Sequence, residues 1–510
     1  MSHGDQQCVL EFLRGAACKD ISQNDVRIVE THISIIVMRG PRVWKVKRAI
    51  RLSYLDFSTP ALRATACERE VMLNRRTAPA LYLGVRRITR GADGELQFGG
   101  EGELVDAVVE MQRFDDSTLF SRLAAEGGLE LSMLTTLARY IASFHENAQV
   151  HIVCSGAAAI EAVLRLNEQN ENMASVLGQE AVRQLRAALR THLHQHARLL
   201  DKRAAGGRIR HCHGDLHLRN ICLFEGKPTV FDCIEFNDSL AVIDVLYDLA
   251  FLLMDLWHAG LPAEANWVMN RYMDEADEVD GLPLLPFFMA LRASIRAQVL
   301  ATQAALPNAQ QRKEIIAQAQ AYLALAMQLL QPASVRMYAI GGLSGSGKST
   351  VAAAIAHFAG AAPGARILST DRIRKRMAGV SSETRLPPSS YTKESSARVY
   401  DALYKQTTRI LTNGYSAMAD GVFSKQEERL RVQQCAEQAG VPFMGIWLEV
   451  QADTLIARVE SRRGDASDAG RAVVLAQLQQ QPDAVEWTVV PAGGTSQATA
   501  EKVLGLLAPD

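Results

Sequence analysis

A glycine-rich stretch late in the chain has the residue types needed to hold a phosphate. Residues 341–350 read GGLSGSGKST, which fits the P-loop pattern Gly-x-x-x-x-Gly-Lys-Ser between an apolar run and an alanine-rich helix. Glycines let successive backbone N–H groups wrap a phosphate at a helix N-terminus. In this pattern the lysine reaches the β- and γ-phosphates of ATP, and the following serine binds Mg²⁺. We therefore predict an ATP site made by Gly342, Ser344, Gly345, Ser346, Gly347, Lys348, Ser349 and Thr350, with Ser349 as the metal ligand.

Four other side chains are placed to complete this site. Asp371 follows an apolar run, at the end of a strand where it could deprotonate an acceptor hydroxyl. Capping of the next helix is its alternative role. Asp420 also ends an apolar run and suits a Mg²⁺ partner. Arg458 and Arg462 share a helix face by i,i+4 spacing, which predicts a lid over the phosphates or, alternatively, an exposed basic helix end.

A second polar constellation lies much earlier in the chain. Residues 213–220 read HGDLHLRN, and Asp232 comes twelve residues after Asn220. Phosphoryl transfer needs a carboxylate that accepts the proton of the attacking hydroxyl, together with oxygen ligands for Mg²⁺. An aspartate, an asparagine five residues later and an aspartate after a short hairpin supply these groups, although all three are also common in turns.

Two lysines and two glutamates extend this constellation. Lys45 and Lys47 lie on one face of a predicted strand, and Glu68 and Glu70 lie on the following predicted helix. A strand lysine steadied by a helix glutamate holds the nucleotide phosphates in kinases. The residues alone leave open which lysine and which glutamate form the pair, and they also allow a solvated charged surface.

The secondary-structure elements predicted to position these residues differ between the first and second parts of the chain. Alternating polar and apolar residues predict strands at 26–50, and more strands are predicted at 83–112. A helix is predicted at 60–76, and apolar residues at helical spacing predict helices from 117 to 205. Beyond a seam at Pro332, apolar strands alternate with helices, which indicates a parallel, doubly wound sheet. The predicted strands of that second part are 337–341, 366–370, 416–420, 443–450 and 485–490.

The motifs of the first part resemble the aminoglycoside phosphotransferase family, a branch of the protein-kinase-like fold. The resemblance rests on HGDLHLRN, on FDCIEF after it, and on the runs WKVKRAIRLSYLDFST and CEREVMLNRRTAPALYLGV. It implies that Asp215 is the catalytic base and that Asn220 and Asp232 are metal ligands. It favours Lys45 over Lys47 and Glu70 over Glu68, and it places Glu110 and Met111 at the hinge that meets adenine.

The last part resembles small-molecule P-loop kinases of the gluconate kinase, chloramphenicol phosphotransferase and zeta-toxin type. That likeness is carried by STDRIRKRMAG and by the arginine-bearing lid. The two resemblances imply an α/β multidomain protein. An N-terminal α+β, bilobal protein-kinase-like domain covers 1–333, and a C-terminal doubly wound parallel-sheet P-loop NTPase domain covers 334–510.

The amino-acid composition limits the kinds of molecule that this protein is expected to bind. Lys and Arg number 55 against 56 Asp and Glu, for a net charge of −1, so no global basic field attracts nucleic acid. The eight cysteines are scattered without a CxxC pair, and the N-terminus lacks an apolar signal core, which predicts a cytoplasmic protein with reduced thiols. We predict a small-molecule acceptor and no membrane partner; the oligomeric state stays undetermined.

These inferences lead to one main hypothesis and two alternatives. The main hypothesis is ATP- and Mg²⁺-dependent phosphorylation of a hydroxyl on a sugar, an aminoglycoside or aminocyclitol, or a nucleotide sugar, with both domains active. In the first alternative, one domain binds ATP without catalysis and regulates the other. The second is a polynucleotide-end kinase, whose basic groove would depend on Arg372, Arg374, Lys375 and Arg376.

Overall fold

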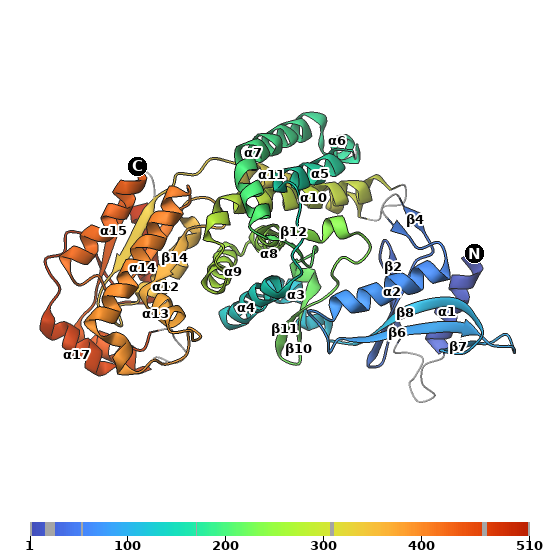
Figure 1. Ribbon diagram of the computed structural model, residues 1–510, viewed down its shortest axis with the longest axis horizontal. Helices are drawn as coiled ribbons and strands as arrows, with labels where there is room; N and C mark the ends of the chain where they lie inside the picture. The colour runs from blue at the N-terminus through green and yellow to red at the C-terminus, as the bar shows by residue number, and fades with distance from the viewer. Residues whose placement is uncertain are drawn as a thin grey trace. The chain divides into compact units, whose positions relative to one another are not determined.

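The computed structural model describes residues 3–15, 26–52, 55–169, 171–306, 311–461 and 467–507. These residues form two compact units (Figure 1). Unit 1 contains Met1–Ala159 and Leu200–Asp255, and unit 2 contains Ile160–Leu199 and Leu256–Asp510. Unit 2 thus contains helices that precede the predicted seam at 333/334. The two units are defined by their contacts and not by function, so the boundary between the two functional domains at 333/334 stays a prediction.

Unit 1 begins with an antiparallel sheet whose strand order is β1-β2-β3-β8-β6-β7. A tight turn at Gly40, with φ of 52°, joins β2 to β3. β8 lies between β3 and β6, so it is buried along most of its length. The strands are β1 (Val26–Glu30), β2 (Ser34–Arg39), β3 (Arg42–Lys47), β6 (Tyr82–Arg90), β7 (Leu96–Phe98) and β8 (Glu103–Gln112), and a small hairpin is formed by β4 (Arg51–Leu52) and β5 (Leu55–Asp56).

Two helices cover this sheet. α2 (Pro60–Asn74) starts at the proline, and the Thr59 side chain caps it by accepting a hydrogen bond from the Leu62 N–H. α2 packs on β6 and β8 through a core that includes Cys67 and Val71. The polar-looking N-terminus forms a second helix, α1 (His3–Gly15), whose Val9 and Leu13 are buried against the sheet.

The rest of unit 1 carries the loops of the first predicted site. Short strands and turns follow the helices here. The elements are α3 (Phe120–Glu126), α4 (Leu131–Asn147), β9 (Ile209–His211), β10 (Ile221–Phe224), β11 (Lys227–Val230), β12 (Val242–Asp244) and α8 (Val245–His258). β10 and β11 form a hairpin, and β9 pairs with β12. Helices α5 (Gly156–Glu168) and α7 (Gln179–Ala205), like α8, contribute residues to both units.

Unit 2 contains the parallel sheet that the sequence predicted. Its strand order is β14-β15-β13-β16-β17, and every neighbouring pair is parallel. The strands are β13 (Met337–Gly341), β14 (Arg366–Ser369), β15 (Ala417–Asp420), β16 (Phe443–Glu449) and β17 (Thr488–Pro491). The predicted fold class is confirmed, and only the last strand is displaced, from 485–490 to 488–491.

Helices lie beside this sheet (Figure 1). α12 and α18 pack together against one apolar core, while α14 and α15 contact each other and the strands β14, β15 and β16. The helices of unit 2 are α6 (Asn172–Leu177), α9 (Pro262–Glu275), α10 (Leu285–Ala305), α11 (Arg312–Leu329), α12 (Lys348–Ile355), α13 (Thr370–Met377), α14 (Lys393–Thr412), α15 (Gln426–Ala439), α16 (Ala452–Ser461), α17 (Arg471–Gln480) and α18 (Ser496–Leu507).

One stretch of unit 2 has the length and apolar character of a membrane span. That stretch is Val279–Ala305, although the sequence predicted no membrane partner. Within the structure, 72% of its most apolar window is buried. Burial of this kind is typical of a core helix.

Candidate active sites

The loop that holds Asp215 is closed on itself by hydrogen bonds. Gly214 has φ of 83°, and a Cβ there would meet the Leu240 carbonyl oxygen at 2.9 Å, so only glycine fits this turn. The Asn220 side-chain N–H₂ donates to Asp215 Oδ2 at 2.9 Å and to the Asp215 carbonyl at 3.0 Å. His217 Nε2 lies 3.3 Å from the same carboxylate. The structure therefore brings the predicted base and one predicted metal ligand together.

One buried aspartate holds this loop, and a second lies on the strand before α8. Asp248 accepts hydrogen bonds from the backbone N–H groups of His213, at 3.0 Å, and Gly214, at 2.9 Å. Asp244 forms a two-point ion pair with Arg203, with both N–O distances 2.7 Å. Both aspartates are buried, but only Asp248 fixes the backbone of the loop, and Asp215 is the carboxylate that faces outward.

The predicted lysine contacts both the predicted glutamate and Asp232. Lys45 Nζ lies 2.8 Å from Glu70 Oε1 and also pairs with the Asp232 carboxylate. Lys47 pairs with the other oxygen of Glu70, at 2.5 Å, and with Glu235. One glutamate thus holds both lysines, but only Lys45 reaches the predicted metal ligand. Asp232 has φ of 62°, a strained conformation of the kind that clusters at functional sites.

The charges in this cluster stabilise one another. Burial alone would raise the pKa of Glu70, but Lys45 and Lys47 outweigh it and lower that pKa to about 2. Burial opposes the charge on Lys45, yet Asp232 and Glu70 raise its pKa well above the usual value. Both groups are therefore charged at neutral pH. By contrast, Glu68 is exposed and pairs with Arg87 at 3.1 Å.

The residues predicted at the nucleotide hinge lie on β8. Glu110 is opposite Trp44 in the register of β3 and β8, and Met111 is opposite Val43. Met111 is buried among the apolar residues under α2. Their contact with adenine stays a prediction.

The glycine-rich loop in unit 2 joins β13 to α12 in a shape that glycine permits. Gly342, Gly345 and Gly347 have φ values of 141°, 90° and 91°. A Cβ on Gly342 would lie 2.7 Å from the Leu448 carbonyl oxygen, and one on Gly345 would lie 2.8 Å from that of Leu455. Close backbone packing therefore requires glycine at both positions.

The polar side chains of this loop converge on its mouth. Ser349 Oγ donates to Asp420 Oδ2 at 2.6 Å, which joins the start of α12 to the end of β15. Lys348 Nζ donates to the Leu343 carbonyl at 3.0 Å and so lies across the loop. Ser344 is held by Gln477, whose side-chain oxygen accepts the Ser344 N–H at 2.9 Å. Thr350 is exposed in the first turn of α12.

Asp371 lies at the same edge of the sheet. It falls in the first turn of α13, directly after β14, and β14 is paired to β15. Burial raises its pKa and the Asp420 carboxylate raises it further, while a hydrogen bond with Ser467 and the charge of Lys348 partly offset this rise. Asp371, Asp420 and Lys348 therefore share one electrostatic environment, as expected for strand ends at a switch point of a parallel sheet.

Comparison with known families assigns both regions. Residues 55–282 match the phosphotransferase enzyme family, and residues 337–486 match an AAA domain of the P-loop kinase type. The chain is an ATP-dependent phosphotransferase. We refer to the two matched regions as the phosphotransferase domain and the AAA domain. The family matches confirm the predicted kinase-like part followed by a P-loop part.

Relatives and solved structures give a coarser likeness. An uncharacterized protein of Mycobacterium tuberculosis is 28% identical over 468 residues, or 90% of each chain. The adenylyl-sulfate kinase of Myxococcus xanthus is 29% identical over 174 residues, covering 32% of this phosphotransferase and 87% of that protein. A solved amicoumacin kinase is 14% identical, with a TM-score of 0.40, and covers 64% of this chain and 94% of its own.

The predicted arginine lid is only partly visible in the phosphotransferase structure. α16 does lie over the P-loop, because Leu455 and Val459 contact Gly345. However, the Arg458 guanidinium donates to the Gly494 carbonyl at 2.6 Å. The structure thus pairs Arg458 with the loop before α18. Arg462, the other predicted lid arginine, lies outside the described residues.

Sequence reasoning missed a carboxylate that closes the acceptor side of the AAA domain. Asp468 Oδ2 accepts hydrogen bonds from Lys375 Nζ at 2.7 Å, from the Leu386 N–H at 2.9 Å and from the Tyr391 hydroxyl. The only signal in the sequence is an acidic residue among small ones, and it does not identify the partners of Asp468, which lie 77 to 93 residues earlier in the chain.

The Glu70 cluster leads to a stability prediction for the phosphotransferase domain. Glu70→Gln leaves Lys45 and Lys47 buried with one counter-charge fewer, so we expect the free energy of unfolding to fall by about 3–5 kcal/mol. Glu68→Gln, the matched control two residues earlier, should change it by less than about 1 kcal/mol because that pair is exposed. Urea unfolding measures both, and equal effects would contradict the assignment of Glu70 as the shared partner.

Proposed function

We propose that the AAA domain transfers the γ-phosphoryl group of ATP to a hydroxyl of a small molecule. The P-loop backbone and Lys348 bind the phosphates, and Asp371 accepts the proton of the attacking hydroxyl. A bond then forms from that oxygen to the γ-phosphorus, the bond to the β-phosphate oxygen breaks, and ADP leaves. The raised pKa of Asp371 supports this role, because it brings the carboxylate closer to the proton affinity a base needs near neutral pH.

The observation that carries the proposal is the bond between Ser349 and Asp420. A hydroxyl and a carboxylate oxygen 2.6 Å apart, at the mouth of a P-loop, are the hard oxygen ligands that Mg²⁺ prefers. These two residues would hold the ion, which would neutralise charge on the β- and γ-phosphates. Lys348, which now lies across the loop, would turn to the same phosphates.

We further propose that the phosphotransferase domain has its own active site, so that the chain is bifunctional. Asp215 is the base, Lys45 binds the nucleotide phosphates, and Asn220 and Asp232 would hold a second Mg²⁺ through their side-chain oxygens. Support comes from the convergence of these residues: Asn220 bonds to Asp215, and Lys45 pairs with Asp232. We place the domain boundary at 333/334, with the two domains covering 1–333 and 334–510.

The proposed acceptors are a sugar, an aminoglycoside or aminocyclitol, or a nucleotide sugar. The acceptor side of the AAA domain offers charged and hydroxyl groups such as Arg374, Lys375 and Tyr391, which suit a polar molecule. The likeness to an adenylyl-sulfate kinase adds sulfated nucleotides to the molecules worth testing. The use of ATP and the free thiols of the described cysteines support a cytoplasmic location.

Product analysis tests the proposal directly. The full chain with ATP and Mg²⁺ is incubated with a panel of sugars, aminoglycosides, nucleotide sugars and adenylyl sulfate, and with a metabolite extract. Mass spectrometry should detect at least one molecule that gains a phosphoryl group, and chelation of Mg²⁺ should abolish the product. Absence of any phosphorylated product from both the panel and the extract would overturn the proposal.

A further inference from the structure

A helix of the phosphotransferase domain completes the edge of the AAA-domain sheet. β14 is the outer strand, and α9 is hydrogen-bonded to its first residues and to the loop before it, within the same compact unit. Asn270 Oδ1 accepts the Ile367 N–H at 2.7 Å, and its N–H₂ donates to the Ala365 carbonyl at 3.3 Å. Asn266 donates to the Pro363 and Ala365 carbonyls at 3.0 and 3.2 Å. Two buried asparagines thus take the place of a neighbouring strand.

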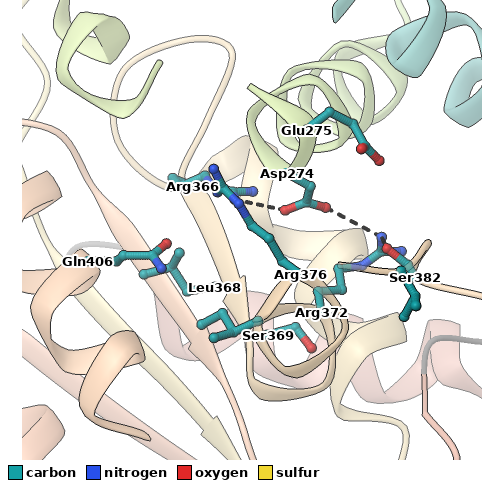
Figure 2. A pocket seen from close by; sticks show the side chains of 11 residues that line it. Asp274, Glu275, Arg366, Leu368, Ser369, Arg372, Arg376, Ser382 and Gln406 are labelled. Atoms are coloured by element: carbon teal, nitrogen blue, oxygen red, sulfur yellow. Dashed lines mark hydrogen bonds and ion pairs between the residues drawn. The ribbon is translucent and has the colours of Figure 1, made fainter. Parts of the chain in front are cut away.

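Asp274, in the last turn of α9, connects this edge to the active-site helix. Figure 2 shows its carboxylate between two arginines of the AAA domain. Oδ1 lies 2.7 Å from Arg366 Nη2, at the start of β14, and Oδ2 lies 3.4 Å from Arg372 Nη1, on α13. All three side chains are largely buried, so little water screens these pairs.

Arg372 is the residue directly after Asp371. Its guanidinium also donates to Ser382 Oγ at 3.0 Å, and Ser382 begins the segment that runs to Tyr391. Further along the same helix, Lys375 bonds to the Thr384 carbonyl and to Asp468. The position of α13 therefore determines the positions of Asp371 and of the segment from Ser382 to Tyr391. Asp274 contacts α13 from outside the AAA domain.

The same residues line a cavity that also contains Glu275 and Arg376 (Figure 2). An anion is not its natural occupant, because Asp274 already provides the negative charge that Arg366 and Arg372 bind. The chemistry of the cavity is that of an internal ion-pair network between two domains.

We propose that Asp274 is a positioning residue for phosphoryl transfer by the AAA domain. Through Arg372 it fixes α13, and with it Asp371 and residues 380–392, so that a helix of the phosphotransferase domain sets the acceptor site of the other domain. The catalytic part of this inference rests on the proposed function of Asp371; the structural part stands without it.

Hydrogen exchange of the full chain tests the structural part. In Asp274→Asn, amides of 371–392 should exchange about tenfold faster than in the wild type, because a charge-assisted contact to Arg372 is lost. Asp277→Asn is the matched control: this exposed acid three residues later pairs with Arg409 instead. Exchange in 371–392 that is no faster in Asp274→Asn than in Asp277→Asn would overturn the proposal.

A second variant covers the case in which Asp274→Asn loosens the whole unit, which faster exchange in β13 and β16 would reveal. Arg372→Gln keeps the pair between Asp274 and Arg366 and removes the contact from Asp274 to α13, together with the hydrogen bond from Arg372 to Ser382. It should accelerate exchange in 371–392 and leave β14 unchanged. If it leaves 371–392 unchanged, the proposal fails.

Steady-state kinetics separates positioning from general stability. With an acceptor from the product analysis, Asp274→Asn should raise the KM for the acceptor about tenfold with little change in the KM for ATP, and Asp274→Glu should recover part of the loss. Equal changes in both KM values, or no recovery in Asp274→Glu, would contradict a positioning role. If no acceptor is found, the exchange result still decides the structural part, so failure of the proposed function is distinguishable.

Discussion

Replacing Lys348 by alanine is expected to lower phosphoryl transfer by the AAA domain by about 10³-fold. Lys348 is the one lysine of the P-loop, and its ammonium group spans the loop at the mouth where Ser349 meets Asp420. Alanine removes the charge that stabilises the transferring phosphoryl group and leaves the glycine backbone intact. The measurement is product formation with the acceptor found by mass spectrometry, at saturating ATP.

A binding experiment separates this effect from loss of the fold. Calorimetry with a non-hydrolysable ATP analogue and Mg²⁺ should show two nucleotide sites in the wild type and also in Lys348→Ala, with weaker affinity at one of them in the variant; loss of that site altogether would indicate loss of the fold. Lys405→Ala is the matched control, because Lys405 is an exposed lysine on α14 of the same domain. Unchanged turnover in Lys348→Ala would show that the AAA domain does not perform the measured reaction.

Replacing Asp215 by asparagine is expected to lower transfer by the phosphotransferase domain by about 10²–10⁴-fold. The substitution keeps the size of the side chain that Asn220 and His217 contact, but it removes the carboxylate that accepts a proton. Nucleotide binding should remain, because the pair between Lys45 on β3 and Glu70 on α2 does not involve the loop of Asp215. The kcat should therefore fall while the KM for ATP changes little.

The pair of single variants decides between two active sites and a regulated one. Asp93→Asn, in an exposed turn of the same unit, is the control for Asp215→Asn. If each variant loses a different product, the chain is bifunctional. If Asp215→Asn retains every product and Lys348→Ala loses all of them, the phosphotransferase domain is a regulator and the bifunctional proposal is wrong.

The P-loop and its sheet could be predicted because their signals are local. A glycine spacing specifies the loop, and apolar runs specify the strands, so the order of elements from β13 onward followed from the sequence. The exception is the last strand, which was predicted at 485–490. It begins at Thr488, because the preceding Trp487 packs against Gly445 instead of extending the strand.

The choice between neighbouring charges required the fold. Glu68 and Glu70 are two residues apart on α2, so they point to different sides of the helix, and only the packing of α2 on β8 determines which side is buried. Lys45 and Lys47 share a face of β3, and both bind Glu70. The segment after the β10–β11 hairpin distinguishes them, because its Asp232 pairs with Lys45 and its Glu235 pairs with Lys47.

Contacts between segments that are distant in the sequence could not be predicted. Asn266 and Asn270 are spaced i,i+4 on α9, which reads as an ordinary polar helix face. Their partners lie about a hundred residues later at the edge of a strand. Arg458 likewise sits where a lid would be expected, yet it binds the carbonyl of Gly494 because the loop before α18 lies within its reach.

The cover that α9 gives to β14 also bears on the order in which this protein can be made. An uncovered outer strand offers its backbone to any other strand, including one from a second nascent chain. During synthesis, residues 262–275 leave the ribosome before residues 366–369, so the segment that covers this edge is available when β14 emerges. The order of the two domains in the chain therefore keeps the covering segment and the strand in one molecule.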